Sequence, residues 1–246
     1  VWANRSHALV QNLDDRQDVL DRGFAVPARL HVIRGSGVDV RGLQPLPEPP
    51  GPVVATMVSR ILWDKGVAEL VEAARILRAR GAPVTVRLVG DRDPANPNSA
   101  GADDLQRWRA AGDVELPGYS TDVRQVWAES HIAVLPSYRE GMPKSLLEPA
   151  ACGRPLVTTD TTGCRDLVPD GETGILVPLY DPHALADAIQ RLSEDPEMRR
   201  RLGANARALA EREFSEARVI ADTQALYRAL AVESAPRVKR TAPRTD

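Results

Sequence analysis

Residues 53–90 read VVATMVSRILWDKGVAELVEAARILRARGAPVTVRLVG. The two ends, VVATMVS and VTVRLVG, are short apolar runs rich in β-branched residues, a composition that favours buried strands. Residues 65–80, between them, form an amphipathic stretch that predicts a helix. A strand, a helix and a second strand in this order predict a βαβ unit with parallel strands.

The same alternation continues along the chain. Further apolar runs lie near 114–116 and at 131–136, 155–159 and 174–178, and helical stretches lie near 105–111, from 121, and at 145–152, 182–194, 196–211 and 215–231. Parallel strands joined by helices are buried on both sides. We therefore predict an α/β fold with a Rossmann-like parallel sheet and helices on both faces.

The two ends of the chain differ from this pattern. Residues 1–43 contain one strand–helix–strand unit, followed by GSGVDV, and the proline-rich QPLPEPPGP at 44–52 is typical of a linker. We assign 53–233 to the main domain and predict that 234–246, which lack apolar periodicity, are disordered. The chain begins without methionine, so we expect a piece of a longer protein.

Composition excludes several classes of protein. The 246 residues are 43% hydrophobic and carry a net charge of -2, so no general attraction to nucleic acid is expected. No apolar run approaches the roughly 18 residues of a membrane span, which predicts a soluble, cytoplasmic protein. Cys152 and Cys164 have no nearby histidine pair and match neither a zinc site nor a disulfide framework.

The stretch YREGMPKSLLEPAACGRP at 138–155 places two carboxylates, Glu140 and Glu148, around the start of a helix. The Gly-Met-Pro turn before the helix leaves backbone N–H groups unpaired at the positive end of the helix dipole, which favours a phosphate. Lys144 adds a cation there. Carboxylates accept hydrogen bonds from diols, so a sugar and a ribose on either side of a diphosphate would suit the pair. The alternative is an exposed Glu140 and a helix salt bridge between Glu148 and Lys144.

A second cluster, SRILWDKG at 59–66, follows the first strand of the main domain. Ligands of open α/β sheets bind beyond the carboxyl ends of the strands, and Arg60 and Lys65 lie at such an end. Two cations in this place suit a diphosphate. Taken alone, they are more typical of ordinary surface residues.

Together these motifs resemble a known family. The stretches SRILWDKGVAELVEAA, LVGDRD, LPGYSTDV and LPSYREGMPKSLLEPAACGRPLVTTDTTGCRDLVPDGETGILV are similar to the nucleotide-sugar-binding, C-terminal half of glycosyltransferase family 4, which has the two-lobed GT-B fold. The most specific part is the pair of glutamates in EGMPKSLLE. Residues 1–43 then resemble the last βαβ unit and hinge of an N-terminal acceptor domain that is mostly missing.

The resemblance implies a role for each matching residue. Arg60 and Lys65 would bind the donor diphosphate and stabilise the leaving nucleotide, Glu140 would contact the donor sugar, and these three would carry the catalysis. Glu148 would bind the ribose diol. The other implied donor contacts are Gly118 and Tyr119 at the base, and Gly141, Met142, Pro143 and Lys144 at the phosphate.

The resemblance also implies an activity for the longer protein. It would be a retaining hexosyltransferase of bacterial polysaccharide or lipid-linked glycan synthesis, with a UDP-sugar as the donor and no metal requirement. Its glycan or lipid-linked acceptor would bind the N-terminal domain, at the inner face of the membrane. The donor-binding half alone would be inactive.

Other interpretations remain open at this point. Asp91 and Asp93 end a strand and would be the metal motif of a single-lobed, metal-dependent transferase. A non-catalytic nucleotide-sugar-binding or partner-docking module would have the same motifs. The loop at 158–166, TTDTTGCRD, either approaches the sugar or is a structural turn. A dehydrogenase and a P-loop enzyme are disfavoured, because G-x-G-x-x-G and G-x-x-x-x-G-K are absent.

Overall fold

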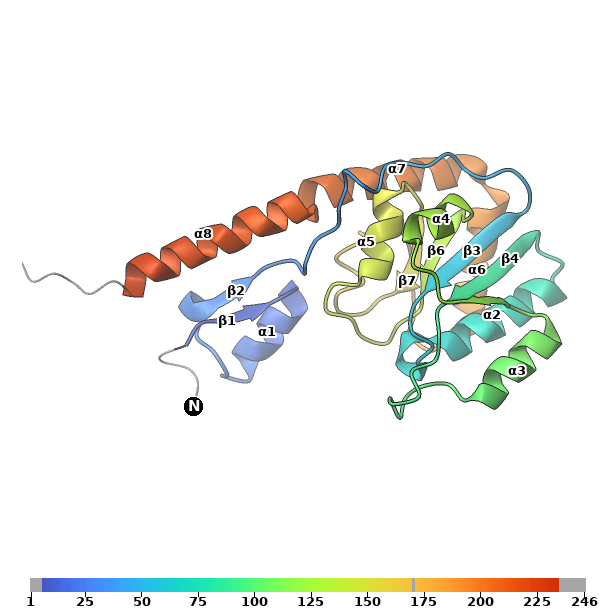
Figure 1. Ribbon diagram of the computed structural model, residues 1–246, viewed down its shortest axis with the longest axis horizontal. Helices are drawn as coiled ribbons and strands as arrows, with labels where there is room; N and C mark the ends of the chain where they lie inside the picture. The colour runs from blue at the N-terminus through green and yellow to red at the C-terminus, as the bar shows by residue number, and fades with distance from the viewer. Residues whose placement is uncertain (1–5, 170, 235–246) are drawn as a thin grey trace, which may run out of the picture.

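The computed structural model describes residues 6–169 and 171–234 and confirms the predicted α/β fold (Figure 1). The predicted disordered tail lies outside the described residues except for Ser234, which ends a helix. In chain order the helices and strands are β1 (Ala8–Val10), α1 (Leu13–Asp21), η1 (Pro27–Arg29), β2 (Leu30–Val32), β3 (Val53–Val58), η2 (Trp63–Lys65), α2 (Val67–Ala79), β4 (Val84–Val89), α3 (Ala102–Ala111), β5 (Glu115–Gly118), α4 (Val123–Ala128), β6 (Ile132–Leu135), α5 (Lys144–Ala151), β7 (Leu156–Thr159), β8 (Gly174–Val177), α6 (Pro182–Glu194), α7 (Pro196–Glu213) and α8 (Glu216–Ser234).

The main domain is built on a six-stranded parallel sheet with the order β5-β4-β3-β6-β7-β8. Helix α2 packs against α6, and α5 packs against α7. Right-handed crossovers place α2 and α5 on opposite faces, because β4 and β7 lie in opposite directions from the strands that precede them. The sheet is therefore covered on both sides, and its interior strands β6 and β7 are buried at every position.

The strand order reverses between β3 and β6. The chain leaves β3 toward β4 on one side, whereas β6, which pairs with the other side of β3, leads toward β7. In open α/β sheets, ligands bind beyond the carboxyl ends of the strands at such a reversal. The segments with Arg60 and Lys65 and with Glu140 follow these two strands.

The N-terminal residues form a separate unit in which β1 and β2 make a two-stranded parallel sheet beside α1. Helix α1 is capped by Asn12, whose side chain accepts a hydrogen bond from the Asp15 backbone. After β2 the chain is tied to the start of α8, because Val38 N donates to Phe214 O and Glu216 N donates to Val38 O. Helix α8 projects from the main domain (Figure 1).

The proline-rich linker after this unit is bound tightly to the main domain. The buried Arg154 donates to Pro47 O at 2.8 Å, and Leu46 N donates to Cys152 O at 3.1 Å. Arg199 on α7 holds both oxygens of Glu48, at 2.8 and 3.1 Å. The linker therefore follows a fixed path over α5 and α7.

Buried polar side chains in the main domain have specific partners. His131 is 3% exposed; its Nδ1 accepts from Val54 N and its Nε2 pairs with Pro49 O. Burial lowers its pKa, which favours the neutral ring. Cys152 and Cys164 are buried free thiols. No described helix is long and apolar enough to cross a membrane.

Candidate active site

The centre of the candidate site is an ion pair between two of the predicted residues. Lys65 Nζ lies 2.6 Å from Glu140 Oε1, and the two side chains are only 22% and 12% exposed. Lys65 ends η2, beyond β3, and Glu140 lies in the loop beyond β6. The strand order therefore brings together two residues that are 75 positions apart in the sequence.

The turn that carries Lys65 is fixed against the loop that carries Glu140. Asp64 O accepts from Tyr138 N at 2.9 Å and from Ser137 Oγ at 3.1 Å. Gly66 has φ +75°, and a Cβ there would lie 2.0 Å from Pro136 O. A glycine after Lys65 is therefore required both for the backbone conformation and for the close approach of the two segments.

The loop at 158–166 supports the backbone of Glu140 from the other side. Glu140 N donates to Thr162 O at 3.2 Å, and Thr161 Oγ1 donates to Tyr138 O at 2.8 Å. Gly163 has φ +77°, and a Cβ there would lie 2.5 Å from both Glu140 O and Gly141 O. These contacts hold the loop against the backbone of Glu140.

Arg60 forms no hydrogen bond or ion pair with either of these two residues, and it lines a cavity of about 390 Å³ at the ends of β3, β4 and β5. Tyr119, one of the residues expected at the base, lines the same cavity and is 70% exposed. Arg60 Nη1 forms an ion pair with Asp93 Oδ2 at 2.8 Å. Within 6–169 and 171–234, no group of three or more His, Cys, Asp or Glu side chains is arranged to hold a metal ion.

Gly118 shapes the same end of the sheet. Its φ is +92°, and its carbonyl accepts from Gly90 N at 2.9 Å. The φ of Gly90 is +147°, and a Cβ there would lie 1.8 Å from Ser59 O. The two glycines allow the loops after β3, β4 and β5 to pack closely beside the cavity.

Helix α5 begins one residue earlier than predicted, at Lys144, with Pro143 as the preceding cap. Pro143 O accepts from Leu146 N and Leu147 N. In the described part of the chain, the backbone N–H groups of Gly141, Met142, Lys144 and Ser145 donate no hydrogen bond. Unpaired N–H groups at the start of a helix are the arrangement that binds phosphate.

Glu148 lies one turn further along α5 and does not form the salt bridge with Lys144 that was the alternative interpretation. No described residue forms a hydrogen bond or ion pair with its half-buried carboxylate. Burial raises the pKa of Glu148, and the positive charge of Lys144 opposes this only in part. An acceptor held in this state costs stability unless a ligand donates to it.

We expect Glu148→Gln to raise the thermal stability of the ligand-free chain at neutral pH while weakening nucleotide binding about tenfold. A raised pKa means that the folded chain binds the proton more tightly, so this group's stabilisation is present at low pH and lost as the pH rises through the folded pKa. The difference in thermal stability between the variant and the native chain should therefore shrink as the pH falls toward 4.5, the ordinary pKa of a glutamate. Calorimetric unfolding from pH 4 to 8 measures this, with Glu197→Gln, at an exposed position, as the control.

The N-terminal unit contacts the phosphate-facing turn directly. Asn12 Nδ2 donates to Gly141 O at 3.0 Å, and the ion pair between Asp15 and Arg139 spans 2.6 Å. Gly35, with φ +68°, lies against the Met142 side chain so closely that a Cβ there would be 2.8 Å from it. These contacts were not predicted from the sequence. The one signal for them was the polar Asn12, which follows shortly after the end of β1.

The structure thus divides the predicted site residues into groups. Lys65 and Glu140 are in contact, and the turn at 141–143 continues from Glu140 into α5. Arg60 and Tyr119 share the cavity at the ends of β3, β4 and β5. Glu148 contacts neither group. Asp93 was weighed only as a metal ligand, yet it holds the Arg60 guanidinium.

Comparison with known proteins identifies a family for most of the chain. The family described as "Glycosyl transferases group 1" matches residues 43–209. An N,N'-diacetylbacillosaminyl-diphospho-undecaprenol alpha-1,3-N-acetylgalactosaminyltransferase from Campylobacter jejuni is 35% identical over 62% of this chain and 39% of its own length. The capsular polysaccharide biosynthesis glycosyltransferase CapM from Staphylococcus aureus is 30% identical over 72% of this chain and 46% of its own length. The chain therefore spans less than half of each of these relatives.

A solved structure shows the same fold. Anabaena HepE, in complex with UDP-glucose, superposes with a TM-score of 0.75 over 92% of this chain and 64% of its own length, at 22% sequence identity. At this identity the likeness is one of fold.

Proposed function

Because this chain belongs to the group 1 family of glycosyl transferases, we propose that it is the donor-binding half of a retaining glycosyltransferase of family 4. The donor is a nucleotide diphosphate sugar, and the acceptor is a glycan or lipid-linked glycan. The observation that carries the proposal is the Lys65–Glu140 pair, which places one cation and one carboxylate beside each other at the switch point of the sheet.

The chemistry of the pair suits the junction between the sugar and the diphosphate. Lys65 would donate to a phosphate oxygen and stabilise the charge that develops as the nucleotide leaves. Glu140 would accept from a sugar hydroxyl, and its contact with Lys65 fixes the lysine before the donor arrives. The free N–H groups at the start of α5 would bind the same diphosphate.

The nucleoside would lie beyond the diphosphate, at the end opposite the donor sugar. Arg60 would release Asp93 and donate to the diphosphate, with the base in the neighbouring cavity beside Tyr119. Glu148, which has no partner among the described residues, would accept from the ribose diol. UDP is the nucleotide we favour, since HepE shares the fold and was solved with UDP-glucose. We propose that no metal is required.

The wider role follows from the relatives. The Campylobacter and Staphylococcus proteins are named for transfer to a diphospho-undecaprenol glycan and for capsular polysaccharide synthesis. We propose a comparable acceptor here, bound by a further N-terminal domain that completes the β1–β2 sheet, so that this half alone transfers no sugar.

Calorimetric titration in EDTA with UDP, UDP-N-acetylglucosamine, UDP-N-acetylgalactosamine, GDP-mannose and ADP-glucose tests the proposal. Binding of one nucleotide family without metal is the expected result. Binding that requires a divalent ion would favour the metal-dependent alternative at Asp91 and Asp93. No binding by any of the five, to this chain or to a longer one, would favour a docking module.

The Glu140→Ala variant separates the sugar from the nucleotide. We expect it to bind the UDP-sugar about tenfold more weakly, because a charged acceptor for a sugar hydroxyl is lost. Affinity for UDP alone should stay within about threefold, since the phosphate contacts of Lys65 remain. Parallel titrations with UDP and the UDP-sugar measure the difference. An equal loss for both ligands would contradict the assignment of Glu140 to the sugar.

A further inference from the structure

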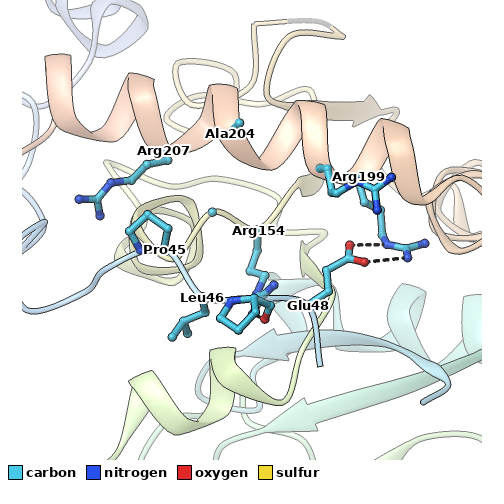
Figure 2. A pocket seen from close by; sticks show the side chains of 10 residues that line it. Pro45, Leu46, Glu48, Arg154, Arg199, Ala204 and Arg207 are labelled. Atoms are coloured by element: carbon cyan, nitrogen blue, oxygen red, sulfur yellow. Dashed lines mark hydrogen bonds and ion pairs between the residues drawn. The ribbon is translucent and has the colours of Figure 1, made fainter. Parts of the chain in front are cut away.

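A second cavity, of about 540 Å³, lies between α7 and the linker, far from the loops just described. Figure 2 shows α7 on one side and the linker residues Pro45, Leu46 and Glu48 on the other. Arg154, which lines this cavity, precedes β7, whereas the candidate active site lies beyond the carboxyl ends of the strands. The two sites are therefore at opposite ends of the parallel sheet.

Four arginines and one glutamate line the cavity: Arg154, Arg199, Arg200, Arg207 and Glu48. Two of the arginines are neutralised, since Arg199 holds Glu48 in a two-point contact and Arg207 pairs with Glu211 at 2.6 Å. Arg154 and Arg200 have no carboxylate within ion-pair distance among the described residues. Two of the four arginines on the cavity therefore form no ion pair within the described residues.

Arg154 is the unusual member of this pair, because it is only 1% exposed. Its Nε donates to Trp127 O at 3.0 Å and its Nη2 to Pro47 O at 2.8 Å, but its Nη1 donates no hydrogen bond to any described residue. Burial lowers the pKa of the guanidinium. The negative charge of Glu48 offsets this effect only in part. An anion in the cavity would therefore stabilise the buried cation further.

The remaining wall of the cavity is apolar, formed by the linker residues Pro45, Leu46 and Pro47 and by Ala204 on α7. A volume of this size takes a small organic molecule. An arginine with free donors is well suited to phosphate oxygens, and the apolar wall suits a compact uncharged body attached to them.

We propose that this cavity is a second ligand site, separate from the donor site, and that it binds a compact phosphate monoester such as a hexose phosphate. The phosphate lies against Arg154 Nη1 and Arg200, and the ester group lies against the linker. Because the linker forms one wall, an occupied site holds the linker more firmly on α7.

Thermal unfolding with glucose 6-phosphate, inorganic phosphate and glucose, at matched ionic strength, tests the proposal. Millimolar glucose 6-phosphate should raise Tm by roughly 5 °C near saturation, and glucose should have no effect. A weaker shift with inorganic phosphate is expected, because the ester group adds contacts. An equal shift with inorganic phosphate would overturn the assignment of an ester.

Matched variants locate the site. Arg200→Glu should lose most of the shift, with at least tenfold weaker binding, while UDP binding is unchanged. Arg201→Glu, the same change at the next exposed position of α7, should keep the shift. Arg154→Met should also lose it where the variant folds. A shift that persists in Arg200→Glu, or that disappears in Lys65→Ala, would refute the second site and place the phosphate elsewhere.

Discussion

The Arg207→Met variant should unfold about 6–20 °C below the native chain, a loss of about 3–5 kcal/mol for a domain of this size. Arg207 is 9% exposed, and its guanidinium donates to the carbonyls of Val40, Leu43 and Ala151 at 2.5–2.8 Å. Methionine keeps much of the side-chain length but donates nothing. Three carbonyls are then left without this donor, and Glu211 loses its cation.

Circular dichroism during heating measures this loss. Arg201→Met is the matched control, because Arg201 is an exposed arginine on the same helix and no described residue forms a hydrogen bond or ion pair with it. We expect the control to stay within about 0.5 kcal/mol of the native chain. If the two variants unfolded at the same temperature, the contacts of Arg207 would not stabilise the fold as we infer.

The Lys65→Ala variant should bind UDP about 10- to 100-fold more weakly, the effect of losing one charge-assisted contact to a phosphate. Lys65 is three-quarters buried against Glu140. Removing it also leaves the Glu140 carboxylate to repel the diphosphate, so the effect should exceed that of Arg60→Ala, whose side chain is 62% exposed.

Titration of UDP into each variant measures both effects. Arg201→Ala serves as the control for a change of net charge. A loss below about threefold in Lys65→Ala would place the diphosphate away from this residue and would remove the main support for the proposed function. Raised salt should weaken UDP binding by the native chain more than UDP binding by Lys65→Ala, because the variant has lost one cation at the site.

The fold was predictable because its strands are short apolar runs, as in VVATMVS, and their burial on both faces leaves a clear signal. The proximity of Arg60, Lys65 and Glu140 to one edge followed from their places after strands. The pairing of Arg60 with Asp93 did not, because it depends on how two loops meet in space. Spacing alone could not show that Glu148 has no salt bridge.

The arginines of α7 were the largest omission. In the sequence Arg199 and Arg207 belong to a polar helix, and arginine is mostly exposed in proteins. Only the packed structure shows that both are buried and that they donate to carbonyls of α6, of α5 and of the segment just before the linker. The same linker was predicted from its prolines, but composition alone carries no information about its partners.

The contact of Asn12 with Gly141 makes the N-terminal unit and the phosphate-facing turn parts of one thermodynamic system. Any ligand that favours one arrangement of this turn also favours the arrangement of α1 that fits it. The free energy of this coupling has one value, whichever partner is bound first. A donor that orders the turn would therefore raise the affinity of the N-terminal unit for the partner that binds there. Binding of that partner would raise the affinity for the donor by the same factor.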